Sequence, residues 1–224
     1  MLKFEEIYLR AAEHKGGVNA LEMLLPEAGN PESVAALGED RFLAEMTRCI
    51  FQAGFVWRVI DQKWQGFEDV FHGFEVNTIL GLQPEDWEEI CADTRIVRNH
   101  QKINSVRANA RFIEDVALET GSFARFIADW PVSDLVGLLE LLKKRGARLG
   151  GNTGQRFLRN VGKESFYLGK DVIRCLQNSG LAIKDNPTSK RELAAIQQAF
   201  NQWHEESKRS YTVMSKIAAY SISS

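Results

Sequence analysis

Apolar side chains recur every three or four residues along almost the whole chain, and strict alternation of apolar and polar residues persists nowhere. The first spacing places apolar groups on one face of an α-helix, whereas a half-buried strand requires a repeat of two. The spacing over residues 42–64 predicts one buried helix face. A second helix is expected over residues 101–119, with Lys102, Arg107 and Arg111 on its charged side. These patterns predict an all-α fold.

Turn and capping signals divide the second half of the chain into further helices. Pro84, followed by two acidic residues, is typical of the first turn of a helix. Another helix is expected over about residues 133–145, and the glycine-rich segment 149–154 that follows it is typical of a tight hairpin. Residues 189–192 have the spacing of a capping box, which predicts the start of one long C-terminal helix over about residues 189–220. No repeat or linker interrupts the pattern, so the 224 residues are expected to form a single domain.

The composition indicates a globular protein of the reducing cytoplasm. Hydrophobic residues make up 44% of the chain, which is enough for a packed core. Cys49, Cys91 and Cys175 are an odd and widely spaced set, which argues against a disulfide framework or a cysteine-rich zinc module. No apolar run approaches the roughly 20 residues that span a bilayer, and residues 1–10 carry acids where a signal peptide would be basic. We therefore expect a cytoplasmic protein with no membrane partner.

Basic residues concentrate in residues 141–174, although the net charge of the whole chain is −2. In this segment nine lysines and arginines stand against two acidic residues, a net charge of +7. Such a local excess is typical of a surface that holds a phosphate backbone. The glycines of the predicted hairpin would let backbone N–H groups approach phosphate oxygens beside the positive end of the next helix. A solvated helix pair joined by an ordinary loop would give the same pattern.

Four short elements, in order, carry a resemblance to a known family. They are Gln52-Ala-Gly54 with Trp57, Ile96-Val-Arg98 with Lys102-Ile103, Asn109-Ala-Arg111, and Leu142-Lys-Lys-Arg-Gly146. As a set they resemble the 3-methyladenine DNA glycosylase I family, in the helix-hairpin-helix superfamily, over about residues 39–175. The resemblance implies two helical lobes with an interlobe cleft, a helix-hairpin-helix element at about residues 134–180, and a monomer. It also implies that the partner is double-stranded DNA, whose damaged base is flipped out for cleavage of its bond to deoxyribose.

The departures from the family pattern concern its pocket and its metal. Cys49 stands where relatives carry a pocket glutamate, and among the N-terminal pocket aromatics only Tyr8 is matched. Relatives also tie their chain ends with zinc held by two cysteines and two histidines. Here His14 is the only early imidazole, and Asp171 replaces a later histidine while Cys175 remains. Since a tetrahedral zinc site needs four suitable ligands, we expect no metal and no cofactor.

Asp171 is the candidate catalytic residue. In the wider superfamily the catalytic carboxylate is an aspartate at the start of a helix beyond the hairpin, and Asp171 resembles it in position. A fixed carboxylate would stabilise the positive charge that develops on the sugar and could orient or deprotonate the attacking water. The alternative is that Asp171 is only a helix N-cap. Superfamily members that also cut the strand use a lysine just after the hairpin, where Gln155 and Arg156 stand here, which favours a hydrolase with one function.

The remaining candidates are assigned to the base or to the DNA backbone. Trp57 could stack on a cationic alkylated purine, or it could belong to the core, because it lies on the apolar stripe of its helix. Cys49 is expected to be a buried, inert thiol. The base-binding candidates are Trp57, Gln52, Tyr8 and Cys49. The DNA-binding candidates are Arg148, Gly150, Gly151, Gly154, Arg156 and Lys102.

Three functions therefore stay open at the level of the sequence. The leading hypothesis is a monofunctional DNA glycosylase that hydrolyses the N-glycosidic bond of alkylated purines such as 3-methyladenine in base-excision repair. The main alternative is a helix-hairpin-helix protein that binds DNA without chemistry, which the loss of the glutamate at Cys49 would permit. A helical protein-interaction domain is the third.

Overall fold

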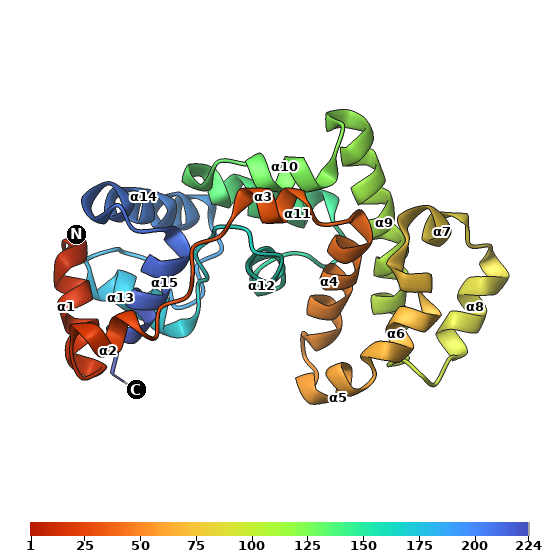
Figure 1. Cartoon of the computed structure of the whole chain (residues 1–224), viewed down its shortest axis with the longest axis horizontal. Helices are drawn as coiled ribbons and strands as arrows, with labels where there is room; N and C mark the ends of the chain where they lie inside the picture. The colour runs from red at the N-terminus through yellow and green to blue at the C-terminus, as the bar shows by residue number, and fades with distance from the viewer. Residues whose placement is uncertain (224) are drawn as a thin grey trace. The chain divides into compact units, whose positions relative to one another are not determined.

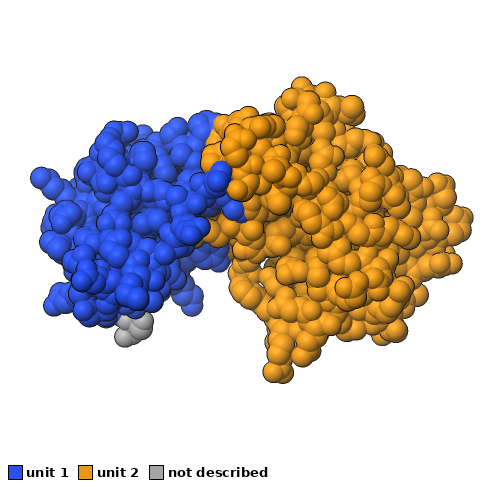
Figure 2. All heavy atoms as spheres, in the orientation of Figure 1, with its two compact units in different colours: residues 1–30, 131–138, 162–224 blue, residues 31–130, 139–161 orange. Residues whose placement is uncertain are grey.

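A computed structural model describes residues 1–223 and contains helices and no strand within that range (Figure 1). The all-α prediction is confirmed. The described chain divides into two compact units, which Figure 2 shows in different colours. Unit 1 comprises residues 1–30, 131–138 and 162–224, and unit 2 comprises residues 31–130 and 139–161. The expectation that both act as a single domain stays a prediction.

Unit 1 is built by segments from both ends of the chain. Its core is aromatic: the Trp203 ring lies 5.7 Å from the Phe4 ring and 5.2 Å from the Phe200 ring, and Phe200 stacks on Phe166 at 4.6 Å. These rings are fully or almost fully buried and join the first helix to the last ones. The helices of unit 1 are α1 (Phe4–His14), α2 (Val18–Glu22), α13 (Lys170–Asn178), α14 (Lys190–Ser207) and α15 (Tyr211–Tyr220), with the 3-10 turn η2 (Val132–Asp134).

Unit 2 is organised around two long helices that lie side by side, α4 (Glu39–Gln52) and α9 (His100–Thr120) (Figure 1). Phe123 joins them, because its ring contacts Phe42 of α4 at 5.3 Å and Phe112 of α9 at 5.5 Å. The other elements are α3 (Pro31–Ala35), α5 (Trp57–Gln62), α6 (Trp64–Val70), the 3-10 turn η1 (His72–Phe74), α7 (Val76–Gly81), α8 (Pro84–Ala92), α10 (Phe123–Asp129) and α12 (Asn152–Asn160). The division between the units falls within α11 (Leu135–Arg145).

Several predicted helices are confirmed with their caps. Pro84 is the first residue of α8, and α9 runs one residue beyond each predicted end. The Asn99 side chain accepts a hydrogen bond from the Lys102 backbone at the start of α9, and Gly121 ends it in the left-handed region at φ 91°. Residues 149–151 of the glycine-rich segment lie, as predicted, in the short connection between α11 and α12, whereas residues 152–154 already belong to α12.

The prediction of one helix face over residues 42–64 is wrong. Helix α4 ends at Gln52, and the chain turns at Gly54, whose φ of 77° suits glycine. Helices α5 and α6 then follow as separate elements. The apolar spacing stays in phase across this break because Ile60 and Phe67 return to the core, which concealed the interruption.

The prediction of one long C-terminal helix is also wrong. The capping box is present, since Ser189 accepts from the backbone of Glu192 while the Glu192 carboxylate accepts from the backbone of Ser189. Helix α14 nevertheless ends at Ser207, because Lys208 takes up a left-handed conformation at φ 56°. Helix α15 then packs against α1 and α13, which closes unit 1. Within the described residues, no helix is both long and apolar enough to cross a membrane.

Candidate functional site

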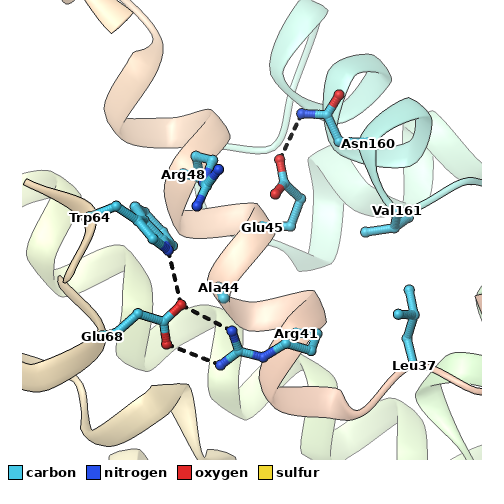
Figure 3. Close-up of a pocket in the computed structure, with 9 residues that line it drawn as sticks. All are labelled: Leu37, Arg41, Ala44, Glu45, Arg48, Trp64, Glu68, Asn160 and Val161. Atoms are coloured by element: carbon cyan, nitrogen blue, oxygen red, sulfur yellow. Dashed lines mark hydrogen bonds and ion pairs between the residues drawn. The ribbon is translucent and has the colours of Figure 1, made fainter. Parts of the chain in front are cut away.

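The central feature of unit 2 is a cavity of about 210 Å³ beside α4 (Figure 3). Helix α4 supplies most of its polar wall, α6 supplies an indole, and the end of α12 supplies an amide. Charged groups of both signs reach the same small space. The cavity is lined by Leu37, Arg41, Ala44, Glu45, Arg48, Trp64, Glu68, Asn160 and Val161.

One half of this cavity is a closed polar network. Arg41 donates from its two terminal nitrogens to the two Glu68 oxygens at 3.0 and 3.1 Å, and it also donates to the Gly73 carbonyl at 2.7 Å. Trp64 Nε1 donates to Glu68 Oε1 at 2.9 Å. The Glu68 carboxylate raises the pKa of the Arg41 guanidinium. The hydrogen-bonding groups of this network pair with one another, and they hold the Trp64 ring in place.

The other half is not closed. Glu45 Oε1 accepts from Asn160 Nδ2 at 2.7 Å and from Cys49 Sγ at 3.3 Å, whereas no donor within residues 1–223 reaches Oε2. Arg48 lies with its guanidinium carbon 4.1 Å from the centre of the Trp64 ring. Its Nε is buried and meets no acceptor in the described chain. A carboxylate oxygen and an arginine fork with free hydrogen-bonding capacity therefore line one cavity.

Cys49 is buried, as predicted. Burial, first, and the neighbouring Glu45 raise the pKa of its thiol, so the group stays neutral. The thiol donates a hydrogen bond to Glu45 Oε1, one helical turn earlier on α4. Cys49 thus supports a wall of the cavity, and its assignment to base binding stays a prediction.

Trp57 is not a core residue: it is 49% exposed, so the core alternative is wrong. It begins α5, and the Arg156 guanidinium of α12 lies 3.9 Å from the centre of its ring. Gln52, the last residue of α4, is buried and donates to Asp61 at 3.2 Å. The base-binding roles of Trp57 and Gln52 stay predictions.

The hairpin residues form a second surface of unit 2. Arg148 is exposed, has a left-handed φ of 61°, and donates to Gln101 at 3.2 Å. Gly151, at φ 59°, is the N-cap of α12, and Gly154 is buried where a Cβ atom would collide with the Leu149 carbonyl. A cavity of about 370 Å³ lies here, lined by Ile50, Ala53, Lys102, Arg148, Gly150 and Thr153.

Lys102 does not lie on a solvated basic face, and that expectation is wrong. Its side chain is buried, and Nζ donates to the carbonyls of Ala53 at 2.7 Å and Phe51 at 3.1 Å. The cation also lies 4.4 Å from the centre of the Phe55 ring. Burial, and then the charge of Arg148, lowers its pKa. Lys102 therefore holds the end of α4, and its assignment to DNA stays a prediction.

The basic segment is less free than its charge count implies. Arg145 forms a two-pronged pair with Glu119 at 2.7 Å for both bonds, and Lys163 is buried. The segment is also divided between the units, with residues 141–161 in unit 2 and the rest in unit 1. The part in unit 2 keeps six basic residues and no acidic one.

Two sequence-predicted residues belong to unit 1. Tyr8 donates to Glu22 at 2.6 Å, and Arg209 lies 4.7 Å from the centre of its ring. The hydrogen bond to Glu22 raises the Tyr8 pKa. Its place in a base pocket stays a prediction.

Asp171 is the second residue of α13 and is exposed. The N-cap of that helix is Gly169, and no side chain caps it, so the interpretation of Asp171 as an N-cap is wrong. No partner for its carboxylate is found within residues 1–223, which leaves both oxygens available at the positive end of a helix. Among the same residues, no group of three or more histidine, cysteine or acidic side chains could hold a metal ion.

Comparison with known proteins finds a family match over part of the chain. Residues 33–136 match the methyladenine glycosylase family. The resemblance inferred from the sequence is confirmed. The matched region contains α4 to α10, and therefore most of the lining of the first cavity and half of the lining of the second.

The fold is that of helical DNA glycosylases. The structure resembles 3-methyladenine DNA glycosylase I from Staphylococcus aureus at 19% identity and a TM-score of 0.50, over 68% of this chain and 91% of that chain. It resembles 8-oxoguanine DNA glycosylase from Methanocaldococcus jannaschii at 16% identity and a TM-score of 0.54, over 96% and 90%. It also resembles the 8-oxoguanine glycosylase/lyase from that organism, in a structure with a 15mer DNA containing 8-oxoguanine. The sequence identity is 15% and the TM-score is 0.52, over 96% of both chains.

Sequence reasoning missed the polar groups of the first cavity. The sequence analysis did not predict Glu45 or Arg48 as site residues, although Glu45 lies four residues before Cys49 and so shares its face of α4. That spacing was the one available signal. Asn160 gave none, because it is brought to Glu45 by the packing of α12 on α4.

Proposed function

We propose that this protein is a DNA glycosylase that hydrolyses the bond between deoxyribose and a damaged purine, with alkylated purines such as 3-methyladenine as the first class to test. The match of residues 33–136 to the methyladenine glycosylase family carries the proposal. The glycosylase fold supports it.

The connection between α4 and α5 suits an encounter with duplex DNA. Phe55, Val56 and Trp57 are 40%, 66% and 49% exposed, an apolar group that water solvates poorly. Arg156 lies against Trp57 and adds positive charge beside it. Apolar side chains can wedge between base steps, while arginines hold phosphates, and this combination favours extrusion of a nucleotide.

Asp171 is the carboxylate that we assign to catalysis. It is exposed and has no partner among residues 1–223, so it can approach a substrate without first breaking a hydrogen bond to them. As the N-glycosidic bond breaks, positive charge builds on the sugar, and a fixed anion stabilises that charge more than it stabilises the ground state. Its carboxylate also orients water for attack on the same carbon.

The enzyme is proposed to release the base without cutting the strand. Strand cleavage by this superfamily's chemistry needs an amine that forms a Schiff base. The positions after the hairpin hold Gln155 and Arg156, which have no such amine, and Gln155 is buried.

The test is release of free base from methylated duplex DNA by the purified chain. We expect Asp171→Asn to lower the release rate by about a hundredfold or more, since removing a group that acts on the transition state lowers the rate by this order. Glu27→Gln, which removes an exposed carboxylate of unit 1 outside the proposed site, is the matched control and should leave the rate unchanged. An Asp171→Asn protein that folds and releases base at the wild-type rate would refute the catalytic assignment.

A second candidate is a DNA-binding protein without chemistry. The neutral Cys49 thiol in place of the relatives' glutamate favours it. It predicts salt-sensitive binding of duplex DNA and no base release from any lesion.

A further inference from the structure

The cavity beside α4 contains one donor group and one acceptor group that the protein leaves unused. Arg41 and the Trp64 indole N–H both donate hydrogen bonds to Glu68, so the hydrogen-bonding groups of this wall are paired with one another. Among residues 1–223, no donor reaches Oε2 of Glu45 and no acceptor reaches the buried Nε of Arg48. Figure 3 shows both on the same stretch of α4, with Glu45 directed toward Asn160 and Arg48 lying over Trp64.

An unused buried donor is costly enough to need an explanation. Leaving a buried polar group without a partner costs about 1–3 kcal/mol, and more for a charged one. Native proteins keep few such groups, and each one requires an explanation, such as a catalytic role or an ordered water or ion. Buried Nε of Arg48 is of this kind. Glu45 is held in position by Asn160 and Cys49, which leaves its second oxygen free to receive a donor.

The free groups of Glu45 and Arg48 are complementary to one particular hydrogen-bonding edge of a nucleobase. Arginine donates to the O6 and N7 acceptors of guanine, of which 7-methylguanine keeps O6, whereas adenine is read by the mixed donor and acceptor of an amide. A carboxylate accepts two N–H groups side by side. The Watson–Crick edge of a guanine-type base offers both patterns together, namely two N–H donors next to a carbonyl. An adenine-type edge offers an amino group next to a bare ring nitrogen and lacks the carbonyl.

We propose that this cavity recognises the Watson–Crick edge of a guanine-type damaged base, with the free Oε2 of Glu45 accepting from the ring N–H and the amino group and Arg48 donating to the carbonyl oxygen. The inference rests on the proposed glycosylase function and narrows its substrate class. Trp64 contributes through Arg48, because its ring face is already covered by the guanidinium. Trp64 is therefore a positioning residue for Arg48.

The experiment measures binding of free bases, which needs no catalysis. The purified full chain is titrated with 7-methylguanine, which keeps the guanine edge, and with 3-methyladenine, by calorimetry and by tryptophan fluorescence. We expect 7-methylguanine to bind about tenfold more tightly or better, because one good bidentate pair discriminates by this order. Glu45→Gln and Arg48→Lys should each remove most of that preference. Glu89→Gln, an exposed carboxylate on α8, is the matched control and should keep it.

Base release from methylated duplex DNA is followed in parallel, with methylguanines and methyladenines quantified separately. A guanine preference that depends on Glu45 in binding and in release supports the proposal. Equal affinity for the two free bases, or a preference unchanged in folded Glu45→Gln protein, overturns it even if both bases are released. If 7-methylguanine binds through Glu45 but no base is released, the cavity proposal stands and the glycosylase proposal fails.

Discussion

Replacing Lys102 by methionine should destabilise the protein even though lysine is ordinarily a surface residue. The Lys102 ammonium donates to two carbonyls at the end of α4, those of Phe51 and Ala53. Methionine fills nearly the same volume and keeps the apolar stem, but it donates to neither oxygen. The substitution therefore isolates the hydrogen bonds from the packing.

The magnitude follows from the two acceptors. The bond to Phe51 is buried, so its carbonyl loses its partner without gaining water, at about 1–3 kcal/mol. The bond to Ala53 is partly exposed, so water replaces it at smaller cost. Against these losses stands the cost of burying the ammonium, which lowers its pKa and which methionine avoids. We expect a net loss of about 2 kcal/mol in the free energy of unfolding.

Urea unfolding followed by circular dichroism measures the difference. Arg107→Met is the matched control, because Arg107 is an exposed cation on the same helix, and its loss should change stability by no more than about 0.5 kcal/mol. If Lys102→Met unfolds at the same urea concentration as wild type, with the same dependence on urea, the capping role assigned to Lys102 is refuted.

Three further outcomes are expected. Gly154→Ala should cost about 1–3 kcal/mol in urea unfolding because its Cβ meets the Leu149 carbonyl, whereas Gly150→Ala meets only flexible Lys143 carbons and should cost less than about 1 kcal/mol; equal costs would contradict the close approach. The Cys49 thiol, whose pKa burial raises, should resist alkylation at pH 8 in native protein and react in urea, monitored by mass spectrometry against a Cys49→Ser variant. The pKa of Lys102 is lower in the folded protein than its unfolded value of about 10.4, so between these two pH values the unfolded state binds one proton more. The free energy of unfolding of wild type, relative to that of Lys102→Met, should therefore rise with pH across this window. A fall with pH would contradict the lowered pKa.

Local signals predicted local structure well and failed where contacts are distant. The cap at Asn99 and the glycine at position 121 delimit α9, and both can be read from neighbouring residues. The break after α4 was hidden because Ile60 resumes the same apolar phase beyond Gly54. The burial of Lys102 could not be read from its surroundings, since its acceptors lie 49 and 51 residues away. Sequence analysis places a lysine at the surface because lysines are rarely buried, and only the structure reveals a distant carbonyl that accepts its hydrogen bond.

The candidate site shows the same limit in its carboxylates. Position 49 is neutral, and the nearest carboxylate lies four residues earlier, about one helical turn or 5.4 Å along α4. Sequence matching alone treats this as a loss of charge. In the structure Cys49 instead donates a hydrogen bond to Glu45, Asn160 donates to the same oxygen, and Arg48 supplies a cation that lines the same cavity. A wall with one carboxylate alone would favour a cationic base, whereas a wall with Glu45 and Arg48 together favours a neutral edge that offers donors and an acceptor side by side. Under the proposed function, the cysteine at position 49 accompanies a change of specificity rather than a loss of function, and the Glu45 and Arg48 variants test that distinction directly.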